Sequence, residues 1–209
     1  MELLYAALLG FALGSVPFGL ILTRAAGLGD VRDIGSGSIG ATNVLRTGNK
    51  GIALATLLLD AAKGVAAVLL AKAYLPGTEG LAAVGAVAGH CYTPWLNFKG
   101  GKGFATAAGV CGALSWPLML ICGAVWAITV AIFRISSVAS LASVSFAAVA
   151  TFLAPFFGFE TLAPLFLPML AIQVIVVIKH NENIKRLFAG REPKIGSSSK
   201  APPPAADDP

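Results

Sequence analysis

The sequence predicts an all-α protein: a bundle of seven helices that cross a membrane, with the amino terminus outside and the carboxyl terminus in the cytoplasm. Of its 209 residues, 56% are hydrophobic and only 12% are charged, and the mean hydropathy is +0.81. A soluble domain has about 25% charged residues. Apolar stretches near or above about 18 residues recur, and each is long enough for a transmembrane helix. So few charges cannot cover a water-soluble globule of this size.

Seven apolar segments are predicted to span the bilayer. The third and fourth are short, and their division from the fifth depends on the Ser115-Trp116-Pro117 sequence, because the residue before a proline avoids the helical conformation. The alternative is one long kinked helix over 104–133. At about 45 Å it would exceed the roughly 30 Å hydrocarbon core, so two short helices are favoured. The predicted spans are 3–23, 51–75, 81–97, 104–116, 117–133, 136–155 and 163–179.

The positive charges predict the orientation of these spans. Every Lys and Arg outside the second span lies in one alternating set of connections, formed by 24–50, 98–103, 134–135 and the residues from 179 onward. The other set contains only acidic charges. Basic residues stay on the cytoplasmic side, so the carboxyl terminus is expected inside. Merging the fourth and fifth spans would destroy this separation, which supports seven.

One membrane domain is expected over residues 1–195, followed by a disordered cytoplasmic tail over 196–209. The tail contains no apolar residue larger than Ala, so it cannot bury enough surface to fold. The net charge of +5 reflects the cytoplasmic loops and not a nucleic-acid partner. The three cysteines lie in apolar runs without CxxC spacing, so no metal site is expected. The GxGxxG pattern at 35–40 lies between membrane spans, so no dinucleotide cofactor is expected either.

Three polar segments, 32–46, 89–103 and 179–186, reach the same predicted membrane face. Their glycines let the backbone turn N–H groups towards an anion. Hydroxyl, amide and cationic side chains add donors and charge, and the second segment directly precedes an apolar helix whose amino end favours anions. The alternative is flexible loops with cations that extend to the interface. We favour a shared site for phosphorylated ligands, formed by Ser36, Ser38, Thr42, Asn43, Arg46, Lys99 and Lys102 with their neighbouring glycines.

Several further polar residues leave two interpretations open. Asp60 and Lys63 lie on one face of the second span, where a mutually neutralising structural pair is favoured over a functional one. His180 lies in a polar cluster and is weighted towards function, whereas an isolated histidine such as His90 is often a hydrogen-bonded core residue. Ser136, Ser137 and Ser140 open onto the basic face but are also typical of helix packing.

At these segments the chain resembles the bacterial acyl-phosphate:glycerol-3-phosphate acyltransferases, the PlsY family. The matching residues, in family order, are GSGSIGATNVLRTGNKG (35–51), LLDAAKG (58–64), GHCYTPWLNFKGGKGFAT (89–106), RISSVAS (134–140) and KHNENIKRLFAG (179–190). One departure is Ser38, where the family commonly has Asn. The His-x₄-Asp box of other acyltransferases is missing, because Pro94 and Trp95 follow His90 at that distance.

The resemblance implies transfer of a fatty acyl group from acyl phosphate to glycerol 3-phosphate, giving lysophosphatidic acid and phosphate. It also implies a monomer in the bacterial inner membrane, surrounded by lipid, with its site facing the cytoplasm and with the substrate's own phosphate as proton acceptor. We expect Ser36, Thr42 and Asn43 with the nearby glycines to hold acyl phosphate. A transporter of a phosphorylated anion is the alternative. Catalytic roles are expected for Ser36, Arg46, Lys102, Ser140, His180 and Asn183, all but Ser36 at glycerol 3-phosphate; binding roles are expected for Gly35, Gly37, Ser38, Gly40, Thr42, Asn43, Lys99, Gly100, Gly101, Gly103, Ser136 and Ser137.

Overall fold

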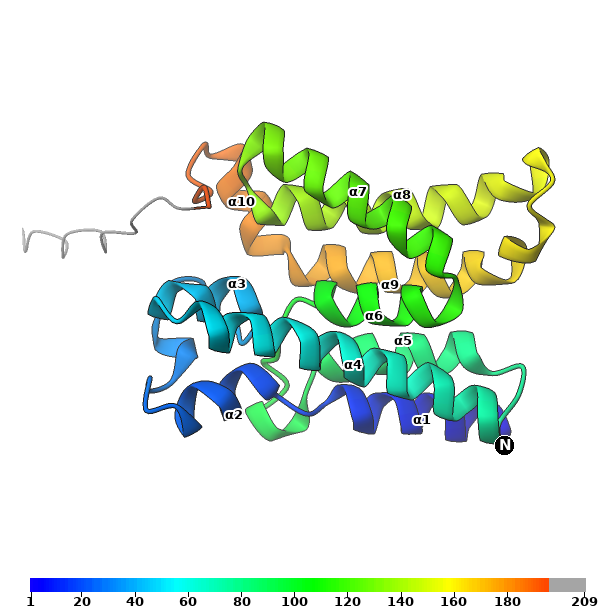
Figure 1. Cartoon of the computed structure of the whole chain (residues 1–209), viewed down its shortest axis with the longest axis horizontal. Coiled ribbons are helices and arrows are strands. Elements are labelled where there is room, and N and C mark those ends of the chain that lie inside the picture. Colours follow the sequence, from blue (N-terminus) through cyan, green and yellow to red (C-terminus); the bar gives the residue numbers. More distant parts are fainter. Residues whose placement is uncertain (196–209) are drawn as a thin grey trace, which may run out of the picture.

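The computed structural model describes residues 1–195 and contains only helices and connecting segments in that range (Figure 1). The expected tail over 196–209 lies outside the described residues. The α-helices are α1 (Glu2–Gly14), α2 (Phe18–Ala25), α3 (Ala41–Val44), α4 (Lys50–Tyr74), α5 (Glu79–Cys91), α6 (Phe104–Leu114), α7 (Trp116–Phe133), α8 (Ser136–Leu153), α9 (Phe166–Lys179) and α10 (Asn181–Phe188). Short 3₁₀ helices are η1 (Val31–Asp33), η2 (Leu45–Thr47), η3 (Pro94–Leu96), η4 (Ala154–Phe157) and η5 (Glu160–Leu165).

The predicted all-α membrane architecture is confirmed in its coarse form. Within residues 1–195, five helical stretches are long and apolar enough to cross a bilayer: Glu2–Ala25, Lys50–Tyr74, Trp116–Phe133, Ser136–Phe157 and Glu160–Lys179. The other two predicted spans correspond to α5, with 13 residues, and α6, with 11. Helix length and hydropathy therefore support five membrane crossings. Helices α5 and α6 are too short to be assigned as crossings by this criterion alone.

The first predicted span, 3–23, is confirmed as an apolar stretch long enough to cross the membrane, but its helix breaks between α1 and α2 around Pro17. Proline lacks a backbone N–H and disfavours helical geometry in the residue before it. The break exposes backbone groups of Ser15 and Val16 that other segments then bind. The Oγ1 atom of Thr93 donates to the carbonyl of Ser15 at 2.6 Å, and the indole of Trp95 donates to the Ser15 hydroxyl at 3.0 Å.

The third predicted span, 81–97, was too long. Helix α5 ends at Cys91, since Thr93 is extended before Pro94. The chain then returns towards α5, where the N–H groups of Gly100 and Gly101 donate to the carbonyls of Cys91 and His90 at 3.2 and 3.0 Å. The segment 92–103 is thus a folded connection rather than the end of a helix.

The predicted turn between the fourth and fifth spans is confirmed. Helix α6 ends at Leu114 and α7 begins at Trp116, and the chain reverses there so that α7 runs back along the bundle (Figure 1). Small residues let neighbouring helices approach closely. A Cβ atom at Gly109 of α6 would collide with the backbone of Ala61 on α4, and one at Gly14 of α1 would collide with Ala86 on α5. These contacts hold the amino-terminal half of the bundle together.

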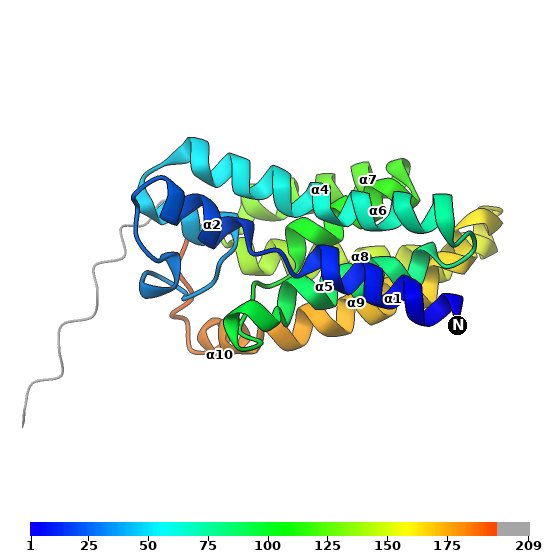
Figure 2. The same ribbon diagram turned by 90° about the horizontal axis from the view of Figure 1, so that it is seen from below.

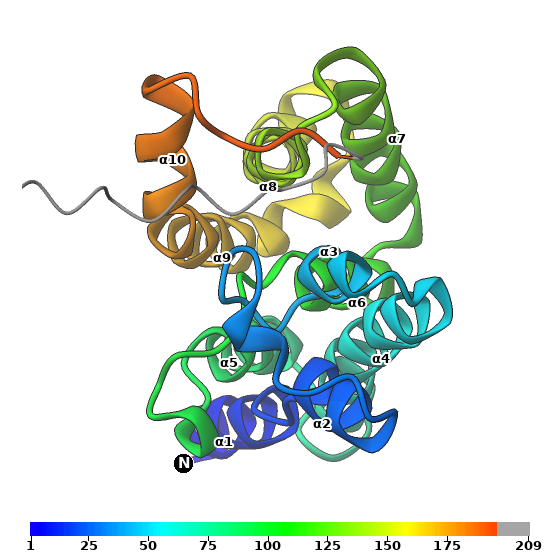
Figure 3. The same ribbon diagram turned by 90° about the vertical axis from the view of Figure 1, so that its left-hand side faces the viewer.

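The connections lie at two opposite ends of the bundle. The amino terminus and the α8–α9 connection share one end, whereas α2, α3 and α10 share the other (Figures 1 and 2). Seen from that second end, α10 lies across the bundle and the following residues pass over α8 towards α7 (Figure 3). This returning segment is pinned by Ile195, whose N–H donates to the carbonyl of Arg134 at 2.7 Å. The three polar segments therefore reach one region of the molecule.

Candidate functional site

A cavity of about 1520 Å³ extends from the polar end of the bundle into its interior. Its polar end is lined by residues of the 33–46 segment, the glycine loop at 102–103, the start of α8, and α10 with the segment after it. Its apolar part is lined by side chains of four long helices, among them Leu57 of α4, Trp126 of α7, Val144 of α8 and Ile172 of α9. The cavity can therefore hold a molecule with an anionic head and a hydrocarbon chain.

A smaller polar hollow of about 160 Å³ lies beside this cavity. It is lined by the loop at 36–38, the glycines at 100–101, and side chains of α9 and α10, including Lys179 and Glu182. Ser36, Ser38, Lys102, Asn183 and Arg186 line both spaces. Two small anions could thus lie side by side with shared donors between them.

Most of the sequence-predicted site residues meet here. Among those with expected catalytic roles, Ser36, Arg46, Lys102, Ser140, His180 and Asn183 all line the large cavity. Among those with expected binding roles, the large cavity is lined by Gly35, Ser38, Gly40, Thr42, Asn43, Gly103, Ser136 and Ser137, and the small hollow by Gly37, Gly100 and Gly101. The exception is Lys99, which is exposed and belongs to neither lining.

Asn43 organises the 31–38 loop. Its amide nitrogen donates to the carbonyls of Val31 and Ser38, both at 2.8 Å, and to that of Ile34 at 3.1 Å. Its amide oxygen accepts from the N–H of Ser36 at 3.0 Å. Asn43 is 3% exposed, and these contacts use its donors and its acceptor. Its amide thus shapes the loop that presents Ser36, although it was expected to donate to a ligand.

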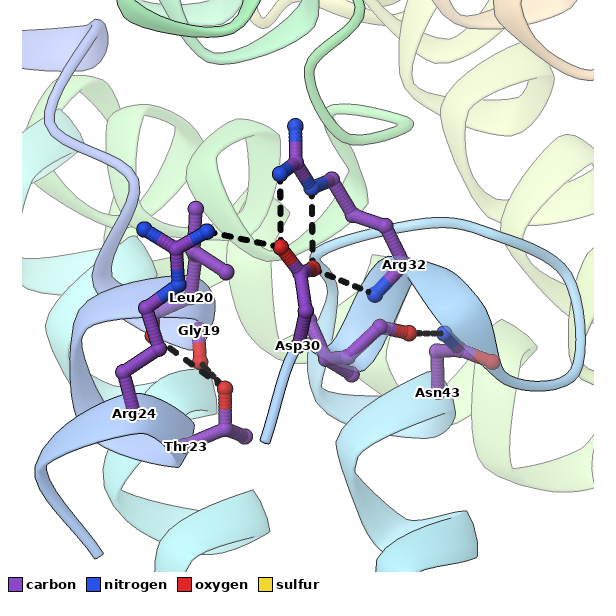
Figure 4. A network of polar contacts seen from close by, with 8 residues as sticks. Gly19, Leu20, Thr23, Arg24, Asp30, Arg32 and Asn43 are labelled. Carbon is purple, nitrogen blue, oxygen red and sulfur yellow. Dashed lines mark hydrogen bonds and ion pairs between the residues drawn. The ribbon is translucent and has the colours of Figure 1, made fainter. Parts of the chain in front are cut away.

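The beginning of the same loop is fixed by Asp30 (Figure 4). Its carboxylate accepts from the backbone N–H of Arg32 at 2.9 Å and from the Nε and Nη2 atoms of the Arg32 side chain at 2.9 and 2.6 Å. It also accepts from Arg24 of α2 at 2.8 Å. Hydrogen bonds from Arg32, more than any other contact, hold the pKa of Asp30 far below its usual range. The carboxylate is therefore charged, and it joins α2 to the start of the loop.

Arg46 packs against the glycine at the start of the loop. Gly35 has φ +55°, and a Cβ atom there would collide with the side chains of Asn43 and Arg46. Position 35 needs glycine for two reasons. Other residues rarely adopt this positive φ, and any side chain there would occupy the space of the Arg46 guanidinium. The arrangement keeps Arg46 beside the Ser36 loop.

Lys102 is half-buried and lines both the cavity and the small hollow. Burial lowers the pKa of Lys102 to about 8, and the neighbouring cations Arg186 and Arg46 act in the same direction. Glu192 partly opposes this effect. A lysine and two arginines from separate segments are therefore close enough to influence one another, and their combined positive charge favours an anion.

His180 is held in one tautomer at the junction of α9 and α10. Its Nδ1 lies 2.8 Å from the carbonyl of Val176, so Nδ1 carries the proton and Nε2 is left as an acceptor. Burial lowers the pKa of His180 to about 4. The neutral ring can therefore accept a hydrogen bond from a ligand hydroxyl near pH 7.

The sequence analysis missed several charged residues that line the cavity, among them Arg186, Arg191 and Glu192. The carboxylate of Glu192 accepts hydrogen bonds from Ser137 at 2.8 Å, from Asn183 at 2.6 Å, and from the Nε atom of Arg186 at 2.8 Å. These hydrogen bonds hold the pKa of Glu192 low despite the opposing effect of burial. The available signal was that Glu192 is the one acid among the basic residues of 185–194. Glu192 joins α8 to α10 along one wall of the cavity.

Ser137 and Ser140, both in the first turns of α8, have different surroundings. Ser137 contacts Glu192, whereas the hydroxyl of Ser140 lies 3.4 Å from the indole nitrogen of Trp126 on α7. Trp126 in turn stacks on Phe104, with ring centroids 5.8 Å apart. Ser140 thus lies where the polar end of the cavity meets its apolar part.

Comparison with known proteins gives a consistent result. Residues 4–190 match the family described as glycerol-3-phosphate acyltransferase. The chain is 54% identical over 192 residues to the glycerol-3-phosphate acyltransferase of Erythrobacter litoralis, covering 92% of this chain and 94% of that protein. It is 53% identical over 195 residues to the enzyme of that name from Mesorhizobium japonicum, covering 93% and 97% respectively.

The fold also matches a solved membrane protein. The crystal structure of PlsY, an integral membrane glycerol 3-phosphate acyltransferase, in its glycerol 3-phosphate form superposes with a TM-score of 0.82 and 31% identity, covering 94% of this chain and 96% of that one. The lysophosphatidic acid form of that protein gives a TM-score of 0.80 with 30% identity, over 93% and 95% of the two chains.

Proposed function

We propose that this chain, which belongs to the glycerol-3-phosphate acyltransferase family, takes its acyl group from an acyl phosphate and binds both substrates in the cavity described above. As a member of this family it is an integral membrane enzyme that transfers an acyl group to glycerol 3-phosphate, giving lysophosphatidic acid. The transporter alternative is therefore not retained. The proposal of an acyl phosphate donor rests on one observation: the basic, glycine-rich polar end of the cavity is continuous with its apolar part.

The donor's hydrocarbon chain would lie in the apolar part of the cavity. Leu54, Leu57 and Leu58 of α4 line it, and their exposed fractions are 55%, 41% and 59%. A membrane-dissolved acyl chain could enter past them without crossing water. The donor's phosphate would then lie at the loop that carries Ser36, where Gly35, Gly37 and Gly40 let backbone N–H groups approach an anion.

Glycerol 3-phosphate would bind beside the donor, between Arg46, Lys102 and Asn183. Arginine holds phosphate through two parallel hydrogen bonds, which a lysine cannot reproduce. Ser140 would lie near the reacting carbonyl, and the free Nε2 atom of His180 would accept a hydrogen bond from a substrate hydroxyl. Asn43 and Glu192 would act indirectly, by holding the groups that contact substrate.

The reaction needs no covalent enzyme intermediate. The substrate hydroxyl attacks the carbonyl carbon, an ester C–O bond forms, and the C–O bond to the phosphate breaks. The phosphate leaves with the electron pair and takes the hydroxyl proton, which balances the reaction. Holding two anions in contact can contribute about 7–11 kcal/mol through proximity. Lys102 and Arg46 would stabilise the charge that develops on the leaving group.

We further propose seven membrane crossings, with α5 and α6 included, the carboxyl terminus in the cytoplasm of a bacterial cell, and a monomer as the active form. The placement of basic connections at one end of the bundle supports the orientation (Figure 1). In intact cells, a cysteine introduced at the exposed position Pro76 should react with a membrane-impermeant maleimide, whereas one at Lys50 should not. The reverse pattern would overturn the orientation.

The donor is tested with purified protein in detergent, glycerol 3-phosphate, and either palmitoyl phosphate or a palmitoyl thioester. We expect lysophosphatidic acid from palmitoyl phosphate and none from the thioester. Ser36→Ala should lose most activity, whereas Ser115→Ala, at the α6–α7 turn, should retain it. Equal use of the thioester would refute the proposed donor.

A further inference from the structure

A buried polar cluster lies between the cavity and the break in the first membrane span. It consists of Asp60 and Lys63 of α4 and His90 of α5, whose exposures are 1%, 6% and 3%. The Nζ atom of Lys63 lies 2.7 Å from Oδ1 of Asp60, 2.8 Å from the carbonyl oxygen of Val16, and 2.9 Å from Nδ1 of His90. The interpretation of Asp60 and Lys63 as a structural pair accounts for only one of these three partners of Lys63.

The contacts determine which nitrogen of His90 carries the proton. Nδ1 of His90 lies 2.9 Å from Nζ of Lys63 and farther, at 3.5 Å, from Oδ1 of Asp60; because an ammonium group has only protons to offer, Nδ1 accepts from Lys63. The ring proton is then on Nε2, at the opposite edge. The ion pair therefore fixes both the tautomer and the orientation of the imidazole.

The opposite edge of the ring lies against the glycine loop. A Cβ atom added at Gly101 would collide with Nε2 of His90, and the next two atoms it would meet also belong to that ring. A Cβ atom at Gly100 would instead collide with the backbone carbonyl of His90. The backbone of His90 also accepts from the N–H of Gly101 at 3.0 Å. The loop is thus held to His90 by both its backbone and its side chain.

Lys102 is the residue that follows these two glycines and lines both the large cavity and the small hollow. We propose that His90, oriented by Asp60 and Lys63, is a positioning residue that places Lys102 against the substrate phosphate. The inference rests on the proposed function, because Lys102 matters only if a phosphate binds beside it. It assigns a role to a charged cluster of which Asp60 and His90 also line the large cavity.

A double-mutant cycle tests the coupling of His90 to Lys102. Loss of one charged hydrogen bond to phosphate corresponds to a change of about tenfold or more in affinity, so His90→Ala should raise the KM for a phosphorylated substrate by that factor. In a Lys102→Ala background the same change should have no further effect, because the residue it positions is gone. A multiplicative loss in the double variant would overturn the proposal.

A second test uses the space between ring and loop. Gly101→Ala should reduce activity, and His90→Ala should partly restore it, because the added methyl group would then occupy the volume of the ring. Gly100→Ala is the matched control: its methyl group meets backbone, so His90→Ala should not rescue it. Failure to rescue Gly101→Ala, or equal rescue of both variants, contradicts the proposal.

Folding is monitored by size exclusion and thermal unfolding in detergent. If His90→Ala does not fold, His90→Asn replaces it, since its amide oxygen can still accept from Lys63 while its shorter side chain no longer reaches the glycine loop. We expect His90→Asn to raise the KM by the same factor as His90→Ala, and to have no further effect in the Lys102→Ala background. An inactive wild-type chain would refute the proposed function, whereas an active wild type with additive variants would refute this inference alone.

Discussion

Glu192→Gln should weaken the site without moving any helix. The carboxylate accepts from Ser137 and Asn183 through Oε1, and from Arg186 through Oε2. Glutamine retains one oxygen and replaces the other with an NH₂ group that can only donate. Either Arg186 or the Ser137–Asn183 pair must then face another donor.

The size of this effect follows from the contacts. A hydrogen bond to a charged group contributes about 1.5–3 kcal/mol, and at least one is lost together with the negative charge. Because the side chain of Arg186 is 36% exposed, water replaces part of that loss. We expect about 2 kcal/mol, which corresponds to a decrease of about thirtyfold in kcat/KM for glycerol 3-phosphate.

The assay compares kcat/KM for glycerol 3-phosphate and the thermal midpoint in detergent. The matched control is Glu160→Gln, an exposed carboxylate at the start of η5 that lines neither the cavity nor the small hollow and should show wild-type kinetics. If Glu192→Gln also shows wild-type kinetics, the carboxylate does not hold the cavity wall and the reasoning is refuted.

Arg46→Lys should raise the KM for glycerol 3-phosphate by about tenfold or more, because lysine cannot form paired phosphate hydrogen bonds; an unchanged KM would exclude that role. With the pKa of Lys102 lowered to about 8, the KM for phosphorylated substrates should rise as pH increases through 8, and Lys102→Arg should flatten that profile; an identical rise in the variant would contradict this origin. The pKa of His180 is lowered to about 4, so the unfolded chain binds a proton below about 6.5 that the folded chain does not. Stability should therefore fall between pH 6.5 and pH 4, and thermal unfolding of His180→Asn should show a smaller decrease; an equal decrease would exclude His180 as its cause. Gly123→Leu should shorten the preferred acyl chain, since Gly123 lines the cavity and a Cβ atom there meets nothing within 4 Å; an unchanged ratio of octanoyl to palmitoyl phosphate turnover would place the chain elsewhere.

Two corrections show where local patterns were insufficient. Pro17 lies inside a stretch whose hydropathy predicts one continuous span, yet it divides α1 from α2. The Pro94 region was assigned to a helix on the same ground, although α5 ends at Cys91. At Trp116 and Pro117 the same proline argument gave the correct turn, because a length limit and the charge distribution agreed with it.

The sequence by itself determined the helical membrane architecture, the turn between α6 and α7, and the set of polar segments that lines the cavity and the small hollow. Each follows from properties that add along the chain: the transfer of apolar residues into lipid, the separation of charge, and the geometry of proline. Only the tertiary structure decided that the amide of Asn43 is used within its own loop, that Lys99 lies outside the cavity, and that Glu192 completes one wall. Whether a polar group contacts a ligand or another part of the protein depends on its distance from residues far away in the chain, and that distance exists only once the helices have packed.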